Sequence, residues 1–145
     1  MPFLDASVPR RLLWPVQAPW PRRRARVLIR RFATCYPEIS YDVEPAVALA
    51  NAQAFLEGGR MRVRLFGGLV RHRKIGTAGL AVVLAHETGH HLGGPPHLVP
   101  YRWLSSEDSA TAWAKTVGIV KVFGSAPAER LWRQGLMQLD EIAPR

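Results

Sequence analysis

The segment His86-Glu87-Thr88-Gly89-His90 follows the apolar run 80–85 directly, and it constrains the fold more than any other part of the chain. The apolar run predicts a helix that crosses a hydrophobic core, and the glycines and prolines at 93–96 predict where that helix ends. On a helix, His86 and His90 lie one turn apart on the same face, so both imidazoles can bind one metal ion. The pattern is typical of zinc hydrolases, in which the intervening glutamate activates a water molecule on the metal.

A catalytic zinc site takes three protein ligands, and the sequence offers three candidates for the third. Glu107 lies 17 residues after His90, in the first turn of the next expected helix, where its carboxylate can face the metal. His97 would have to reach the metal from a loop that two prolines stiffen. Asp108 would point about 100° away from Glu107 on a helix. The spacing therefore favours Glu107, with His97 second and Asp108 third.

Four short segments occur in a characteristic order: Asn51-Ala52-Gln53-Ala54, Gly67-Gly68-Leu69, Val83 to His90, and Glu107 with Ala110. In this order they resemble the M48-type zinc metallopeptidases, which are gluzincins, and His-Glu-Thr-Gly-His-His-Leu-Gly-Gly resembles their short bacterial members. The resemblance covers residues 51–114. It implies an α+β fold, namely a minimal zincin-like domain with a small twisted β-sheet or hairpin, an active-site helix and a second ligand-bearing helix.

The resemblance also implies a role for each site residue. Zinc would be bound by His86, His90 and Glu107, and Glu87 would activate a zinc-bound water to hydrolyse a peptide bond. The family has an aspartate where this chain has Thr111, and loss of such a partner to a zinc-bound histidine can lower metal affinity or activity tenfold or more. The expected function is therefore a zinc metalloendopeptidase. The alternative is a catalytically weakened or inactive zinc-binding sensor or interaction domain.

Peptide hydrolysis further requires a donor for the oxyanion and a surface for the substrate. His97, Tyr101, Arg102 and His72 are candidate donors, although the basic surroundings of His72 predict a solvated side chain. Residues 61–65 alternate apolar and basic side chains, which predicts a half-buried strand. A peptide or protein substrate is expected to add as a further strand along residues 61–66.

The rest of the chain predicts one domain with an irregular start. Residues 1–21 contain five prolines and predict a lead-in without regular structure, and residues 22–145 predict a single zincin-like domain. Helices are expected at 22–33, after a cap at Ser105 or Ser106, and at 128–142. Residues 46–56 fit either a helix or a strand. The last helix is expected to bury four side chains: Leu131, Leu136, Leu139 and Ile142.

The charge of the chain is concentrated near its start. The net charge is +9, carried by 17 arginines and 3 lysines, and eight of the arginines lie between Arg10 and Arg31. No acidic residue occurs between Asp5 and Glu38. This arm suits nucleic acid or an anionic membrane surface. The lack of an aromatic-basic stacking motif favours a merely solvated segment.

The apolar stretches are about eight residues long, and a membrane-spanning helix needs about 20. No signal peptide is evident. A soluble protein is therefore expected, in the cytoplasm, or in the periplasm if a leader is missing.

Overall fold

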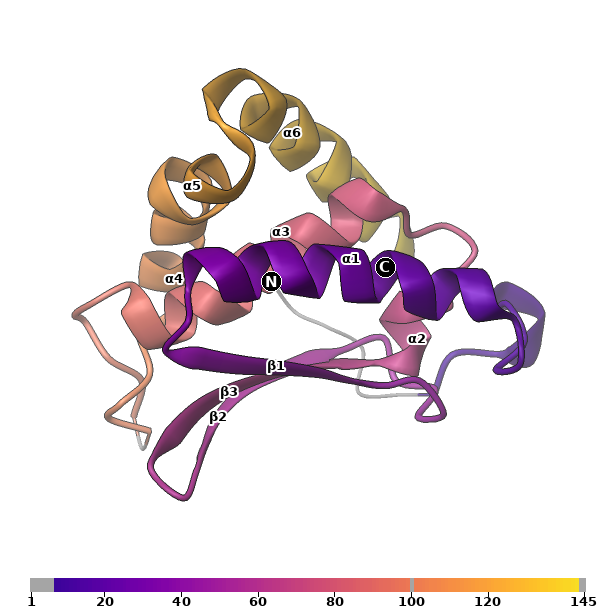
Figure 1. Ribbon diagram of the computed structural model, residues 1–145, viewed down its shortest axis with the longest axis horizontal. Coiled ribbons are helices and arrows are strands. Elements are labelled where there is room, and N and C mark those ends of the chain that lie inside the picture. Colours follow the sequence, from indigo (N-terminus) through magenta and orange to yellow (C-terminus); the bar gives the residue numbers. More distant parts are fainter. Residues whose placement is uncertain (1–6, 100, 144–145) are drawn as a thin grey trace.

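The computed structural model describes residues 7–99 and 101–143, which form an α+β fold around a three-stranded sheet (Figure 1). The strands are β1 (Ile39–Glu44), β2 (Ala52–Glu57) and β3 (Arg60–Phe66). Their order is β1-β3-β2, and β3 pairs parallel with β1 and antiparallel with β2. The small sheet expected from the resemblance is thus present, and the ambiguous segment 46–56 contributes most of strand β2.

The turn between β2 and β3 has a backbone conformation that favours glycine. Gly58 and Gly59 have φ values of 57° and 78°. Residues with a Cβ rarely adopt this region, which explains the pair of glycines. The turn brings the end of β2 back alongside β3, so that Glu57 pairs with Arg60.

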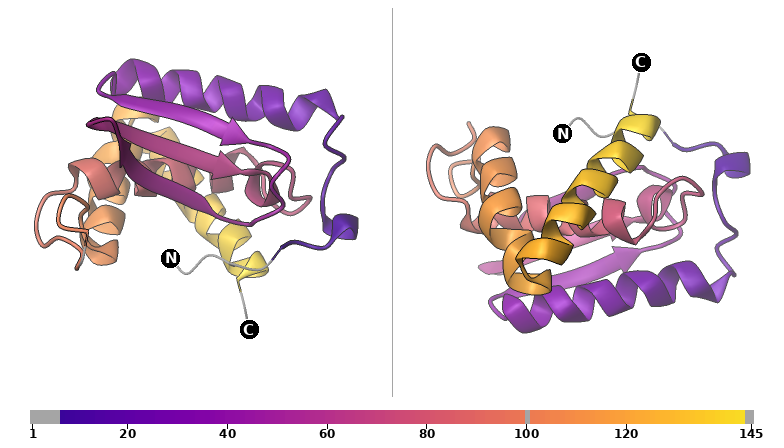
Figure 2. Two further views of the ribbon diagram at one scale, coloured as in Figure 1. Left: turned by 90° about the horizontal axis from the view of Figure 1, so that it is seen from below. Right: turned by 90° about the horizontal axis from the view of Figure 1, so that it is seen from above.

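Three long helices of the described residues, near the two ends of the chain and in its centre, are accompanied by shorter ones. In chain order the helices are η1 (Arg10–Leu12), α1 (Pro19–Cys35), α2 (Gly67–Val70), α3 (Thr77–Leu92), α4 (Glu107–Trp113), α5 (Ile119–Phe123) and α6 (Ser125–Ile142). A π-helical segment, η2 (Ala114–Gly118), joins α4 to α5. Helix α1 runs beside β1 at one edge of the sheet (Figure 2). No helix in the described part of the chain is long and apolar enough to cross a membrane.

Helix α3 is the centre of the core. Every residue from Ala78 to His90 is buried, between the sheet on one side and α6 on the other (Figure 2). A helix that is apolar all round must be enclosed on all sides, and the sequence 78–85 meets this condition. The core therefore fixes the position of His86, Glu87 and His90 at the C-terminal end of α3.

Two expectations about helices need correction. Helix α1 begins at Pro19, inside the predicted lead-in, because prolines in a first helical turn lack only N–H groups that have no partner there. Leu136 on α6 is 39% exposed, while Trp132, Gly135 and Leu139 are buried. The buried stripe includes Gly135 because α6 crosses α3 there, where a Cβ would lie 2.5 Å from the Ala78 carbonyl oxygen.

Candidate metal centre

Three side chains from two helices converge at the C-terminal end of α3. The Nε2 atom of His86 lies 2.8 Å from Oε2 of Glu107, and Nε2 of His90 lies 3.1 Å from Oε1. The ligating atoms of the three residues all lie within 4.8 Å of one another. The two histidines are buried, whereas the Glu107 side chain is 52% exposed. Glu107 is the first residue of α4, which Ser106 caps by accepting a hydrogen bond from the Ser109 amide.

The second ring nitrogen of each histidine has its own partner. Nδ1 of His90 lies 2.7 Å from the Ser105 carbonyl oxygen, and Nδ1 of His86 lies 3.0 Å from Oγ1 of Thr111. A carbonyl oxygen only accepts hydrogen bonds, so His90 carries a proton on Nδ1. Its Nε2 then either holds a second proton or presents a lone pair towards the Glu107 carboxylate. The geometry therefore suits a cation between His90 and Glu107, either a proton or a metal ion.

The donor set is compatible with a metal ion. Donor atoms bound about 2.0–2.1 Å from a tetrahedral zinc ion lie about 3.3 Å apart. The two histidine–carboxylate distances of 2.8 and 3.1 Å are close to this value, so a small outward shift of Glu107 would admit the ion.

The pKa values of the two glutamates in the cluster are shifted in opposite directions. Hydrogen bonds with His86 and His90 hold the pKa of Glu107 well below its usual value, so this carboxylate is ionised. Burial raises the pKa of Glu87 above its usual value. Burial alone would lower the pKa of His90, but the hydrogen bond with Glu107 and the charge of Glu87 raise it. Glu107 is thus suited to hold a cation, and Glu87 to take up a proton.

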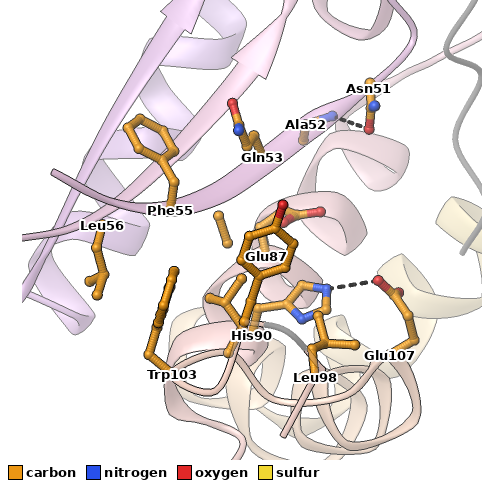
Figure 3. Close-up of a pocket in the computed structure, with 13 residues that line it drawn as sticks. Asn51, Ala52, Gln53, Phe55, Leu56, Glu87, His90, Leu98, Trp103 and Glu107 are labelled. Carbon is orange, nitrogen blue, oxygen red and sulfur yellow. Dashed lines mark hydrogen bonds and ion pairs between the residues drawn. The ribbon is translucent and has the colours of Figure 1, made fainter.

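A cavity of about 460 Å³ opens onto Glu87, His90 and Glu107. Strand β2 forms one wall, and the other is formed by Leu98, Tyr101, Trp103 and Leu104. Figure 3 shows Glu87 and His90 between strand β2 and Trp103. The polar cluster therefore lies at the base of a cleft that polar side chains, Asn51 and Gln53, line together with apolar ones.

Backbone pairing holds the two sides of this second wall together. His97 and Ser105 form an antiparallel bridge, and the Leu98 amide donates to the Leu104 carbonyl over 2.8 Å. The Ser105 amide in turn donates to the His90 carbonyl over 2.7 Å. Ser105 is a site residue that the sequence did not reveal, because it orients His90 through a backbone carbonyl that any residue could supply.

Most of the other candidate metal ligands and oxyanion donors lie away from the cluster. His97 and Asp108 are exposed and lie outside the metal-compatible cluster. Of the proposed oxyanion donors, only Tyr101 lines the cleft in the described part of the chain. His72 is only 3% exposed, so the expectation of a solvated side chain is wrong. The lead-in covers it, since Leu13 forms a bridge with His72, and sequence proximity could not reveal this contact.

Gly89 explains how the two ligand-bearing helices come close enough. A Cβ at position 89 would lie 2.5 Å from the carbonyl oxygen and 3.0 Å from the Cα of Ala110 on α4. The neighbour is backbone, so it cannot rotate away. Gly89 therefore permits the contact of α3 with α4 that brings Glu107 to the histidines.

We expect Gly89→Ala to destabilise the protein by about 1–3 kcal/mol, the usual cost of overpacking a well-packed interior. The same substitution should weaken metal binding, because α4 must move away from α3. Urea denaturation and zinc titration measure the two effects. Thr77→Ala, at an exposed position in the first turn of the same helix, is the control for a substitution to alanine on α3 far from α4. Unchanged stability and metal affinity in Gly89→Ala would contradict this explanation of the close approach.

No protein-family model, curated protein or solved structure matches the chain. The resemblance to M48-type peptidases therefore remains a prediction from its motifs.

Proposed function

We propose that this protein is a zinc-dependent peptidase with a minimal gluzincin-like site. The observation that carries the proposal is the convergence of His86, His90 and Glu107 beside the buried Glu87, at the base of a cleft. A structural zinc site closes all four positions with protein ligands, and this cluster offers three. A mixed set of nitrogen and oxygen donors also favours zinc over calcium or magnesium, which prefer oxygen alone.

In the proposed reaction, His86, His90 and Glu107 hold the ion and Glu87 moves the proton. Zinc, when bound, supplies a Lewis acid that polarises the peptide carbonyl and acidifies water. Glu87 accepts a proton from the attacking water through its carboxylate and later donates it to the leaving amine. The water oxygen forms the new bond to the carbonyl carbon, and the C–N bond breaks. Tyr101, as the oxyanion candidate that lines the cleft, would donate from its hydroxyl.

The substrate is proposed to bind along strand β2. Strand β3 is paired on both sides, so the peptide addition expected along residues 61–66 has no free edge to use. Among the described residues, strand β2 pairs only with β3, and its residues 52–56 line the cleft. An extended peptide added to β2 would pass over Glu87 and His90. This mode requires an unfolded or flexible substrate segment, because a folded strand already has its partners.

The contact of Thr111 helps to decide between the peptidase and the alternative, a zinc-binding domain without catalytic activity. The Thr111 hydroxyl reaches Nδ1 of His86 at 3.0 Å, so it supplies the hydrogen bond, although not the charge, of the aspartate it replaces. This contact favours the peptidase over the inactive domain, since the orientation of His86 does not depend on a carboxylate.

We expect Thr111→Val to lower zinc affinity about tenfold, because the isosteric side chain leaves Nδ1 of His86 without its partner. Thr111→Ser keeps the hydroxyl and should retain most of the affinity. Competition titration with a chromogenic zinc chelator measures both. Equal affinities for Thr111→Val and Thr111→Ser would exclude a positioning role for this residue.

The test of the proposed function is cleavage of an unfolded probe. Zinc-loaded protein should cleave fluorescein-labelled, denatured casein or a fluorescence-quenched peptide mixture. Cleavage should stop with a chelator and return with zinc. Tight zinc binding without cleavage of either probe would favour the sensor or interaction domain.

A further inference from the structure

The outer face of α1 carries a row of arginines. Arg23, Arg26 and Arg30 are exposed, and Arg22 lies beside them at the margin of the same face. Positions three, four and seven residues apart share one side of a helix, so these guanidinium groups form a single strip about 12 Å long. We call Arg22, Arg23, Arg26 and Arg30 the arginine strip.

The arginine strip has no acidic partner in the described residues. The ion pairs of residues 7–99 and 101–143 involve other basic groups, such as Arg62 and Arg64 with Asp42. Two further arginines of α1 are held by backbone carbonyls instead: Arg24 by Ile75 and Arg31 by Val122. The uncompensated charge of the strip is therefore a feature of the folded surface and not only of the composition.

Aromatic and basic side chains interleave at the N-terminal end of the strip. The rings of Trp14 and Trp20 are in edge contact, with centroids 5.2 Å apart. The guanidinium of Arg73 lies 4.0 Å from the Trp14 ring centroid, and that of Arg24 lies 5.1 Å from the Trp20 centroid. Trp20 remains 42% exposed. The sequence lacks a local aromatic-basic motif, but the fold assembles one from the lead-in, α1 and the segment after α2.

These observations favour nucleic acid over an anionic lipid surface as the partner of the strip. A helix that binds a lipid surface inserts an apolar face below the headgroups. Helix α1 instead buries Ala25, Leu28 and Phe32 in the core, and the large apolar side chains that it exposes are Trp20 and Val27, too few to form such a face. Phosphodiester groups need no apolar insertion, and the planar guanidinium suits them through two parallel hydrogen bonds. The exposed part of Trp20 offers a surface on which a base can stack.

We propose that the arginine strip, together with Trp20, binds the phosphate backbone of nucleic acid without sequence preference. The strip lies on the β1 side of the sheet, whereas the cleft is bordered by β2 at the other edge (Figure 2). Nucleic acid on α1 therefore leaves the cleft open. The inference does not depend on the peptidase function.

The test is the salt dependence of binding to a fluorescein-labelled DNA duplex of about 25 base pairs with a short single-stranded overhang, whose unpaired bases can stack on Trp20. Fluorescence anisotropy measures the affinity between about 50 and 200 mM NaCl. The variant Arg23→Ala/Arg26→Ala/Arg30→Ala should bind at least tenfold more weakly at the lower salt concentration. Its slope of log affinity against log salt should fall by about 2.7, since each lost phosphate contact removes about 0.9.

The matched control removes the same charge from elsewhere. Arg102, Arg130 and Arg133 are also exposed, and their triple alanine variant has the same net charge as the strip variant. The slope of this control should differ from the wild-type slope by no more than about 0.9, which corresponds to one phosphate contact. An equal loss in both variants would overturn the proposal, because binding would then follow net charge alone. Anionic vesicles of phosphatidylcholine and phosphatidylserine that bind while the duplex does not would overturn it in favour of a membrane.

Discussion

Glu87→Gln is expected to lower kcat/KM for the fluorescence-quenched peptide mixture by about 10²–10⁴-fold while zinc stays bound. Glutamine keeps the shape of the buried side chain but cannot accept the proton of water. Burial raises the pKa of Glu87 above its usual value, which makes its carboxylate a stronger base. The measurement is the cleavage rate together with the zinc content of the same preparation.

The control for Glu87→Gln is Glu38→Gln, which removes an exposed carboxylate just before β1, outside the cleft. It should leave the cleavage rate and the zinc content unchanged. Cleavage retained in Glu87→Gln would rule out Glu87 as the base. Loss of zinc together with cleavage in Glu87→Gln would instead show that this residue holds the metal.

Zinc is expected to raise Tm by about 10 °C when free zinc exceeds its Kd about a thousandfold. This excess stabilises the folded state by about 4 kcal/mol, and each kcal/mol shifts Tm by about 2–4 °C for a chain of this size. In Glu107→Gln most of the shift should disappear, because a neutral amide replaces the carboxylate that faces both Nε2 atoms. Differential scanning calorimetry with and without zinc measures the effect.

Asp108→Asn is the matched control for Glu107→Gln. Asp108 is the next residue on α4, is exposed and lies outside the cluster, so its replacement removes the same charge from the same helical turn. It should keep nearly the full zinc-dependent shift. An equal loss of the shift in both variants would mean that Glu107 acts through local charge and not as a ligand.

The parts of the site that depend on local spacing could be predicted from the sequence. The helix that carries His86 and His90 and the helix that begins at Glu107 follow from an apolar run, a glycine-proline stop and a serine cap. Their convergence is expected both from the spacing of Glu107 after His90 and from the resemblance. The lack of a Cβ at Gly89, which permits it, is visible only when α4 is in place.

The parts that depend on long-range pairing could not be predicted. The pattern of residues 61–65 indicates a strand but does not say how many neighbours the strand has, and β3 proved to be the central one. The sequence around His72 similarly predicts a solvated side chain. The residue is buried because Leu13, far earlier in the chain, pairs with it. The contact of Trp14 with Trp20 likewise depends on how the lead-in turns before α1.

Ser105 is tied to His90 by both of its backbone groups: its amide donates to the His90 carbonyl, and its carbonyl accepts from the imidazole. The same residue is the base of the loop that carries Tyr101 and Trp103. The position of this loop and the orientation of the imidazole therefore depend on the same residue. A displacement of the Ser105 backbone would shift both the side chains that line the cleft and the ring of His90.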